Sequence, residues 1–284
     1  MAKNTLRSGQ TVTTFGPGAM IDLPDSAVIV GGLEFWNYDA KELKPKIEEP
    51  RLLASIRQHF ERMEWSPPQY LFRPPVERDF GHGFSPHIVG WEFPEWFMVQ
   101  KSEPTVGQVK RRRMVPKALL EKKAKFRDDS GKFLSVVPIR FVRACNRGHC
   151  DDIDWRAFVH GGEESQCMQP LYIEERGSSG TLADTWIVCG CGVERSMSQA
   201  AKRDFDSLGP CSGRRPWLGA ASNERCGLPS RLLIRSASNA YFPQLLSVIS
   251  IPDSGSELAT LIGKLWEKGL KGVAAEGGMT LSQV

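Results

Sequence analysis

The residues of this chain best suited to chemistry are its seven cysteines, which all lie between residues 143 and 226. Cys189 and Cys191 end the apolar run TWIVCGC, and Cys211 and Cys226 follow in the turn-like contexts GPCSG and ERCGL. A structural zinc site takes four Cys or His ligands in a tetrahedron. Glycine beside a cysteine also lets backbone amides point at the sulfur. We therefore predict one zinc site made by these four cysteines.

The alternative for the four cysteines is that some are small buried thiols at strand ends. The first pair is separated by one residue, whereas a gap of two residues is the stronger zinc signal. The sequence alone leaves this alternative open.

A second group of possible metal ligands lies in the segment RACNRGHCDDIDWRAFVHGGEESQC. Its members are Cys145, His149, Cys150, His160 and Cys167. So many sulfur and imidazole donors in a short span are compatible with a second zinc site. The competing interpretation is a strand end, a turn and a helix that starts at Asp152 or Asp154, where aspartate is a favoured N-cap. Both interpretations stand at this point.

Clustered carboxylates in the same segment raise the alternative of an enzyme. Asp151, Asp152 and Asp154 are of the type that holds Mg²⁺ for phosphodiester cleavage. Three acids within four residues cannot all face one site, however, and helix capping accounts for them. The chain has no Walker A motif and no G-x-G-x-x-G loop. A metal-dependent nuclease is therefore the secondary hypothesis, and we expect no catalysis.

A basic segment covers residues 110–127, with nine Lys or Arg residues and a single acid, Glu121, although the whole chain has a net charge of only +4. Such a segment attracts phosphate, and binding through it should weaken with salt. The alternative is a solvated surface or a mobile loop. A nearby Arg-Trp group suits stacking on single-stranded bases, and equally suits packing between domains. The predicted DNA contacts are Lys110, Arg111, Arg112, Arg113, Lys117, Lys122, Lys123, Lys125, Arg214, Arg215 and Trp217.

The elements that position these residues indicate an α+β chain: an irregular mixed domain with a cysteine-rich zinc-binding module. The 284 residues are 40% hydrophobic and rich in glycine and proline, which is typical of a globular protein with many turns. Helical periodicity predicts helices over residues 51–64, 116–124 and 257–268. Apolar runs predict strands over 26–30, 95–99 and 133–142.

The expected domains are an N-terminal α+β region with the basic segment (1–140), the cysteine-rich module (141–252), and an amphipathic helix with a flexible tail (253–284). No apolar stretch reaches the length of a membrane span, and the N-terminus lacks the apolar core of a signal peptide. We therefore expect a cytoplasmic protein that does not bind membranes. In a reducing compartment, its cysteines would be thiols or metal ligands.

Several motifs, taken in order over residues 7–252, resemble the DrmB family, an accessory of the DISARM anti-phage defence system that is related to the cysteine-bearing domain of certain bacterial helicases. They are FGPGAMIDLP, SAVIVGG, VPIRFVRACNRGHCDDIDWRAFVH, TWIVCGCGVERSMS, CSGRRPWLG and RSASNAYFPQLLSVISIP. The resemblance implies a non-catalytic subunit that binds a large helicase-like protein of the DrmA type and loads with it onto phage DNA, single-stranded DNA included. It also implies that Cys189, Cys191, Cys211 and Cys226 hold zinc.

The chain departs from the family pattern in two respects. The first cysteine pair has a one-residue gap, and relatives continue with a mostly helical region where this chain ends soon after Pro252. We expect a truncation point there, and the alternatives are half of a split protein and a short variant that keeps only the front half. The leading hypothesis is a zinc-stabilised accessory subunit that contributes to DNA binding. The alternatives are the nuclease and a DNA-binding module that acts alone.

Overall fold

The computed structural model describes the chain in segments. The described residues are 7, 9–23, 26–38, 46–75, 86–105, 107, 109–121, 124–162, 165–202, 207–219, 222–237, 240–249 and 254–266. The chain divides into two compact units, one of Met1–Pro45 with Arg73–Leu245 and one of Lys46–Phe72 with Leu246–Val284.

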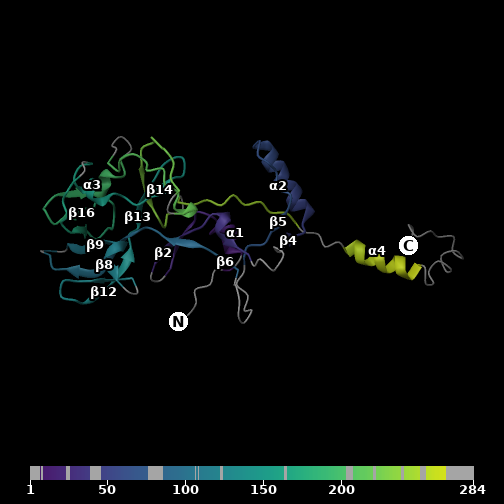
Figure 1. Cartoon of the computed structure of the whole chain (residues 1–284), viewed down its shortest axis with the longest axis horizontal. Helices are drawn as coiled ribbons and strands as arrows, with labels where there is room; N and C mark the ends of the chain where they lie inside the picture. Colours follow the sequence, from purple (N-terminus) through teal and green to yellow (C-terminus); the bar gives the residue numbers. More distant parts are fainter. Residues whose placement is uncertain are drawn as a thin grey trace. The chain divides into compact units, whose positions relative to one another are not determined.

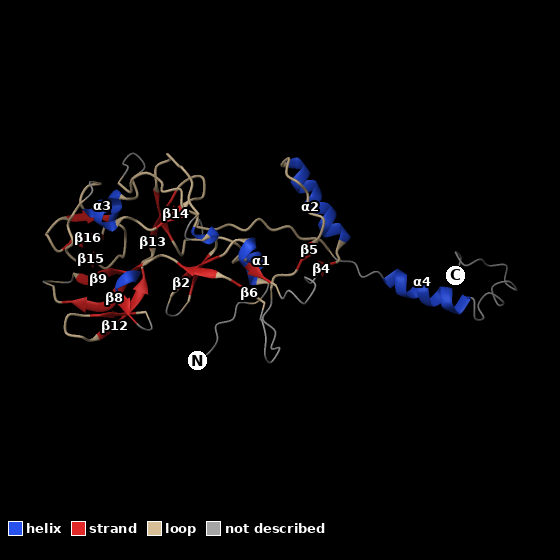
Figure 2. Cartoon of the chain, in the orientation of Figure 1, coloured by secondary structure: helices blue, strands red, loops and turns tan. Residues whose placement is uncertain are grey.

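The larger unit is built on an eight-stranded sheet in which all neighbouring strands are antiparallel (Figures 1 and 2). In spatial order its strands are β10 (Leu120–Glu121), β11 (Lys125–Arg127), β12 (Phe133–Pro138), β8 (Trp96–Glu103), β9 (Lys110–Pro116), β15 (Leu171–Glu175), β16 (Thr185–Cys189) and β17 (Glu194–Ser196). The expected strand 95–99 is the first half of β8. Its alternate residues Phe97 and Val99 are buried, as the two-residue period of a strand requires.

The eight-stranded sheet takes strands from both sides of residue 140. Strand β9 pairs with β15 from Met114 opposite Leu171 to Lys110 opposite Glu175. The sheet therefore does not follow the domain boundary that we expected between 1–140 and 141–252.

Two three-stranded sheets complete the framework around the cysteines. One has the order β1-β2-β7 and the other the order β14-β13-β18. Their strands are β1 (Met20–Asp22), β2 (Ala27–Val30), β7 (Gly90–Glu92), β13 (Phe141–Ala144), β14 (Cys150–Asp151) and β18 (Arg231–Ile234). The short pair β3 (Trp36–Asn37) and β6 (His87–Ile88) lies in the same unit. The expected strand 26–30 is thus confirmed as β2.

The expected single strand 133–142 is two strands that belong to different sheets. Ile139 still donates its amide to Trp96 beside β8, whereas the Arg140 carbonyl accepts from Arg235 next to β18. The chain leaves one sheet for the other at this point, which apolar periodicity cannot reveal.

The expected helix 116–124 is wrong. Residues Lys117–Leu119 form a single 3₁₀ turn (η2), and Leu120 then enters β10 opposite Phe126. Leu120 packs against a buried cluster that includes Phe97 and Val115. This burial outweighs the modest helix propensity of the segment.

The main core lies between the eight-stranded sheet and helix α3 (Trp155–Val159). Trp155, Phe158 and Val159 of the helix are buried against a cluster that includes Ile187 and Met197. Asp154 is the N-cap of α3, since its side chain accepts a hydrogen bond from the Ala157 amide at 2.9 Å. The predicted helix start is therefore confirmed.

The smaller unit contains helix α2 (Pro50–Arg62), the antiparallel strands β4 (Lys46–Ile47) and β5 (Leu71–Phe72) on either side of it in the sequence, and helix α4 (Ser254–Leu265). The two helices confirm the expected helices 51–64 and 257–268 in their described parts. The expected tail lies outside the described residues. Among the described helices, none has both the length and the hydropathy that a membrane span requires.

Candidate metal centres

The structure gathers eight cysteine and histidine side chains into two groups of four. We call the first the outer tetrad and the second the inner tetrad, because the first flanks the second along the sequence. The outer tetrad is Cys145, His149, Cys211 and Cys226, and the inner tetrad is His160, Cys167, Cys189 and Cys191. In each tetrad the four possible ligand atoms lie within 4.8 Å of one another.

The first half of the outer tetrad comes from the tight turn between β13 and β14. Cys145 and Gly148 close this turn with a 3.0 Å hydrogen bond, and Gly148 adopts a left-handed φ of +81°. The turn brings Cys145 Sγ to 3.3 Å from His149 Nδ1. The Arg147 amide also points at Cys145 Sγ, at 3.3 Å, so the backbone is arranged to stabilise a thiolate.

The second half of the outer tetrad comes from a loop whose two arms are joined by hydrogen bonds. The Cys211 amide donates to Leu228, and the Glu224 amide donates to Gly213. Cys226 Sγ thereby lies 4.0 Å from Cys145 Sγ. Gly213 has a φ of +73°, and a side chain there would meet the Glu224 carbonyl oxygen at 1.6 Å. Only glycine allows the arms to approach this closely.

A carboxylate lies behind the outer tetrad. Glu224 Oε1 is 2.8 Å from His149 Nε2, the ring nitrogen that faces away from Cys145. The same carboxylate receives two hydrogen bonds from Arg215, both at 3.2 Å. A histidine that binds metal through one nitrogen usually has such a carboxylate at the other, which fixes the tautomer and the ring orientation.

The inner tetrad is built at the far edge of the eight-stranded sheet. His160 is the C-cap of α3, and Cys189 ends β16. Gly192, at φ +97°, donates to the Cys189 carbonyl and makes the turn to β17 tight. This turn brings Cys191 back toward Cys189, so a one-residue gap suffices. Cys167 Sγ is 3.5 Å from Cys189 Sγ.

The chemistry of both tetrads fits a bound metal ion. All seven cysteines are free of disulfides. The buried His160 Nε2 has no hydrogen-bond partner among the described residues. Three thiols and one imidazole supply the number and softness of donors that tetrahedral Zn²⁺ prefers.

The thiols of the tetrads differ in acidity. Burial raises the pKa of Cys189 and of Cys211 to about 11. Burial acts in the same direction on Cys145, but the hydrogen bonds that its sulfur receives prevail and bring its pKa to about 7. The hydrogen bond from Val193 is the main reason that the pKa of Cys191 is lowered. The pKa is thus lowered for Cys145 in the outer tetrad and for Cys191 in the inner tetrad.

Comparison with known proteins places this chain in a family. The model of a domain of unknown function, DUF8724, matches residues 7–242. The chain belongs to this family. It is also 36% identical over 121 residues to the DISARM protein DrmB of Bacillus paralicheniformis. That alignment covers 42% of the DUF8724 chain and 21% of DrmB. The DUF8724 chain is therefore related to DrmB, and it spans about a fifth of the length of that relative.

The predicted four-cysteine set is divided in the DUF8724 chain. Cys189 and Cys191 lie in the turn after β16, whereas Cys211 and Cys226 lie beside the β13–β14 turn. The second predicted group is divided in the same way. Each cysteine pair is completed by a Cys and a His from that group, because the hairpins and α3 place those residues next to it.

Cys150 belongs to neither tetrad. It follows His149 directly but lies in β14, so its side chain points to the opposite face. There it packs with Ile29, Phe93 and Val142. Burial raises the pKa of its thiol far above the ordinary value, so Cys150 is a core residue.

The first part of the basic segment, Lys110–Pro116, forms strand β9 and is not a loop. Arg111 Nε donates to Glu174 at 2.7 Å, and Arg112 pairs with Glu175 at 2.8 Å, both across the β9–β15 pairing. Lys117 pairs with Glu92 at 2.7 Å, and Arg113 lies over the Phe126 ring. These predicted DNA contacts are used within the fold.

The other members of the basic segment remain candidates for a DNA contact. Lys110 and Lys125 are exposed and make no ion pair within the described residues. Lys122 and Lys123 lie outside those residues.

The predicted Arg-Trp group mainly supports the outer tetrad and its surroundings. Arg214 bonds Asp151 at 3.1 Å, and Arg215 bonds the Glu224 carboxylate. Trp217 packs beside the cluster of Ile29, and its carbonyl accepts from Gly32. The sequence did not single out Glu224, because nothing in the stretch NERC marks that glutamate as a neighbour of His149.

The three clustered acids each have a partner of their own. Asp154 caps α3, and Asp151 pairs with Arg143 and Arg214. Asp152 accepts from the Glu95 amide at 2.9 Å, and its burial raises its pKa to about 7. The three carboxylates therefore do not converge on one point.

Proposed function

We propose that this chain is a non-catalytic, zinc-stabilised accessory component of a DISARM-type anti-phage defence system. The relationship to the DISARM protein DrmB supports the defence role. The observation that carries the proposal is the pair of Cys₃His tetrads in the present chain, which is related to DrmB. When bound, each Zn²⁺ ion would crosslink segments that are distant in sequence, as structural zinc does.

The non-catalytic assignment rests on the ligand number of the tetrads. Four protein ligands fill a tetrahedral zinc ion and leave no position for a substrate or an activated water. The nuclease alternative would need Asp151, Asp152 and Asp154 to act together on a metal ion. The separate partners of the three carboxylates give it no support.

A helicase-like partner of the DrmA type and DNA are the binding partners that we propose. The partner follows from the family resemblance, and the DNA contact is supported by the exposed cations Lys110 and Lys125. Because Arg111, Arg112 and Lys117 are paired within the fold, few phosphates can be bound there. We therefore expect weak, salt-sensitive DNA binding that becomes useful only beside a partner.

The test of this function is affinity purification of the tagged chain from its host during phage infection, followed by mass spectrometry. We expect a stoichiometric helicase-like protein, which should be lost when Cys211→Ser opens the outer tetrad. The control is Cys150→Ala, which leaves both tetrads intact and should retain the partner. Purified chain should not cut DNA in the presence of Mg²⁺. Absence of a helicase-like partner, or Mg²⁺-dependent cleavage that Asp152→Asn abolishes, would overturn the proposal.

A further inference from the structure

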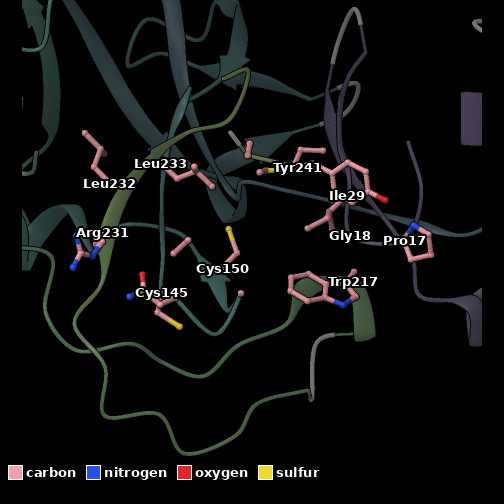
Figure 3. Close-up of a pocket in the computed structure, with 15 residues that line it drawn as sticks. Pro17, Gly18, Ile29, Cys145, Cys150, Trp217, Arg231, Leu232, Leu233 and Tyr241 are labelled. Atoms are coloured by element: carbon pink, nitrogen blue, oxygen red, sulfur yellow. The ribbon is translucent and has the colours of Figure 1, made fainter. Parts of the chain in front are cut away.

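The larger unit contains a pocket of about 540 Å³ whose lining includes Cys145 of the outer tetrad and no member of the inner tetrad. It lies between the sheet β1-β2-β7 and the sheet β14-β13-β18 (Figure 3). Small-molecule sites in proteins commonly have volumes of roughly 300–1,000 Å³. The pocket is therefore large enough for a ligand such as a nucleotide.

One end of the pocket is aromatic and apolar. Trp217 and Tyr241 contribute the rings, and Ile29 and Leu233 contribute the aliphatic surface between them. Gly18, at a φ of +83°, comes so close to Trp217 that a side chain on it would touch the indole at 3.5 Å. Pro17 and Gly18 of the glycine-rich turn therefore form one wall of this pocket, beside the indole.

The other end of the pocket is cationic. Among the described residues, Arg231 is the only charged one that lines it, and no acidic residue of that part of the chain does. Its side chain is exposed and makes no ion pair within the described part of the chain. In Figure 3, Arg231 and Trp217 lie on opposite sides of Cys145 and Cys150. An aromatic end and a free guanidinium suit a planar ligand that carries an anion.

The glycine-rich turn does not bind the anion itself. The Gly18 amide donates to Val30, and the Ala19 amide donates to Gly16. Without free amides at the turn, an anionic group is attracted to Arg231 at the opposite end. This fixes the expected direction of the ligand in the pocket.

We propose that this pocket binds a nucleotide, with its base against Trp217 and its phosphate at Arg231. The nucleotide is either free or the unpaired end of a DNA strand. The inference rests on the DNA contact in the proposed function and gives that contact a specific site. Stacking of a base on an aromatic side chain stabilises such complexes, and the guanidinium suits a phosphate.

The test is calorimetric titration of the full chain with deoxyadenosine monophosphate and with a short single-stranded oligonucleotide. We expect saturable binding of at least one probe. Tight binding of the mononucleotide identifies a free nucleotide as the ligand, and binding of the oligonucleotide alone identifies a strand end. Arg231→Gln should weaken binding at least tenfold. The matched control Arg51→Gln, another exposed arginine on α2, should not.

Trp217→Leu keeps an apolar side chain against the core but removes stacking, and we expect it to weaken binding about tenfold. If this variant does not fold, as judged by its thermal melt, Arg231→Gln alone decides. No saturable binding of either probe, or unchanged affinity in Arg231→Gln, overturns the pocket assignment. Salt-sensitive binding of duplex DNA and partner recovery are measured on the same protein. If duplex binding and partner recovery are retained while neither probe binds, the pocket assignment is wrong and the proposed function still stands.

Discussion

At the residue scale, the centre of the account is the chain of contacts from Arg215 through Glu224 to His149. Glu224 touches the buried imidazole on one side and the guanidinium on the other. Residues behind a metal ligand typically contribute 10- to 100-fold to metal affinity. Arg215, predicted as a DNA contact, therefore acts on the ligand geometry of the outer tetrad.

Replacing Glu224 by Gln should accelerate metal release from the outer tetrad. The amide lacks the negative charge that Glu224 places 2.8 Å from His149 Nε2, so we expect metal affinity there to fall about 10- to 100-fold. Competition with a chromogenic chelator measures this loss. Glu121→Gln, at an exposed strand residue, is the control. Equal release curves for the two variants would show that Glu224 is a surface residue without influence on the site.

Asp152 gives the folded protein a pH dependence. Burial raises its pKa from 3.8 to about 7, so the folded state keeps a proton that the unfolded state loses near pH 4. Stability from this group is present below about pH 4 and is lost as pH rises toward 7. Asp152→Asn removes this loss. Relative to wild type, the variant should gain on the order of 1–2 kcal/mol between pH 5 and pH 8.

Urea unfolding at the two pH values measures the effect of Asp152→Asn. Asp154→Asn is the control, because asparagine is an equally good N-cap and no buried charge is removed. A difference between wild type and Asp152→Asn that does not change with pH would mean that Asp152 is ionised in the folded protein.

At the scale of elements, the loop that carries Cys211 and Cys226 depends on one glycine. Gly213→Ala would place a methyl group on the Glu224 carbonyl and force a left-handed φ on alanine. We expect a loss of at least about 2 kcal/mol of stability and of the metal ion in the outer tetrad. Gly227→Ala, in the same loop but with open space around it, should be neutral. Similar melting temperatures for both variants would contradict the loop geometry.

Neighbouring cations in strand β9 should behave differently. Arg111→Gln leaves the buried Glu174 with one fewer partner, so it should destabilise the sheet by on the order of 1–2 kcal/mol. Lys110→Gln should leave stability unchanged and lower DNA affinity. Thermal melts and a salt series of DNA titrations measure both. If instead Arg111→Gln left stability unchanged and lowered DNA affinity, the basic segment would be the phosphate-binding surface that the sequence predicts.

The sequence predicted those elements whose residues determine them locally. Helix α2 follows from apolar periodicity, and the start of α3 follows from the capping aspartate. The helix prediction failed at residues 116–124, because the burial of Leu120 depends on Phe126 across a hairpin. Residue types also indicated which side chains the fold brings together, since Cys150 alone among the predicted metal ligands lies in neither tetrad.

Which ligands belong together was not predictable from spacing. The grouping depends on the β13–β14 turn lying beside the loop of Cys211, and on α3 ending beside β16. Both juxtapositions are consequences of sheet topology. The family resemblance assigned zinc to four cysteines, but it did not indicate which segments the sheets bring side by side. The contact between His149 and Glu224 belongs to the same class of long-range features.

At the scale of the whole molecule, the two tetrads are nested along the chain. The outer tetrad joins Cys145 to Cys226 across 81 positions, and all ligands of the inner tetrad lie within that span. A metal ion that closes so long a loop restricts the unfolded chain strongly. Each ion would then hold together one face of a fold whose strands come from both halves of the chain.

The metal content of the purified chain, measured by mass spectrometry of the elements, tests this account most directly. The account predicts two zinc ions in the wild type, about one in Cys191→Ser and about one in Cys226→Ser, with two retained in Cys150→Ala. A single site made of Cys189, Cys191, Cys211 and Cys226 would instead give one ion that both serine variants lose completely. That result, or a wild-type chain that contains no metal, would contradict the two-tetrad structure.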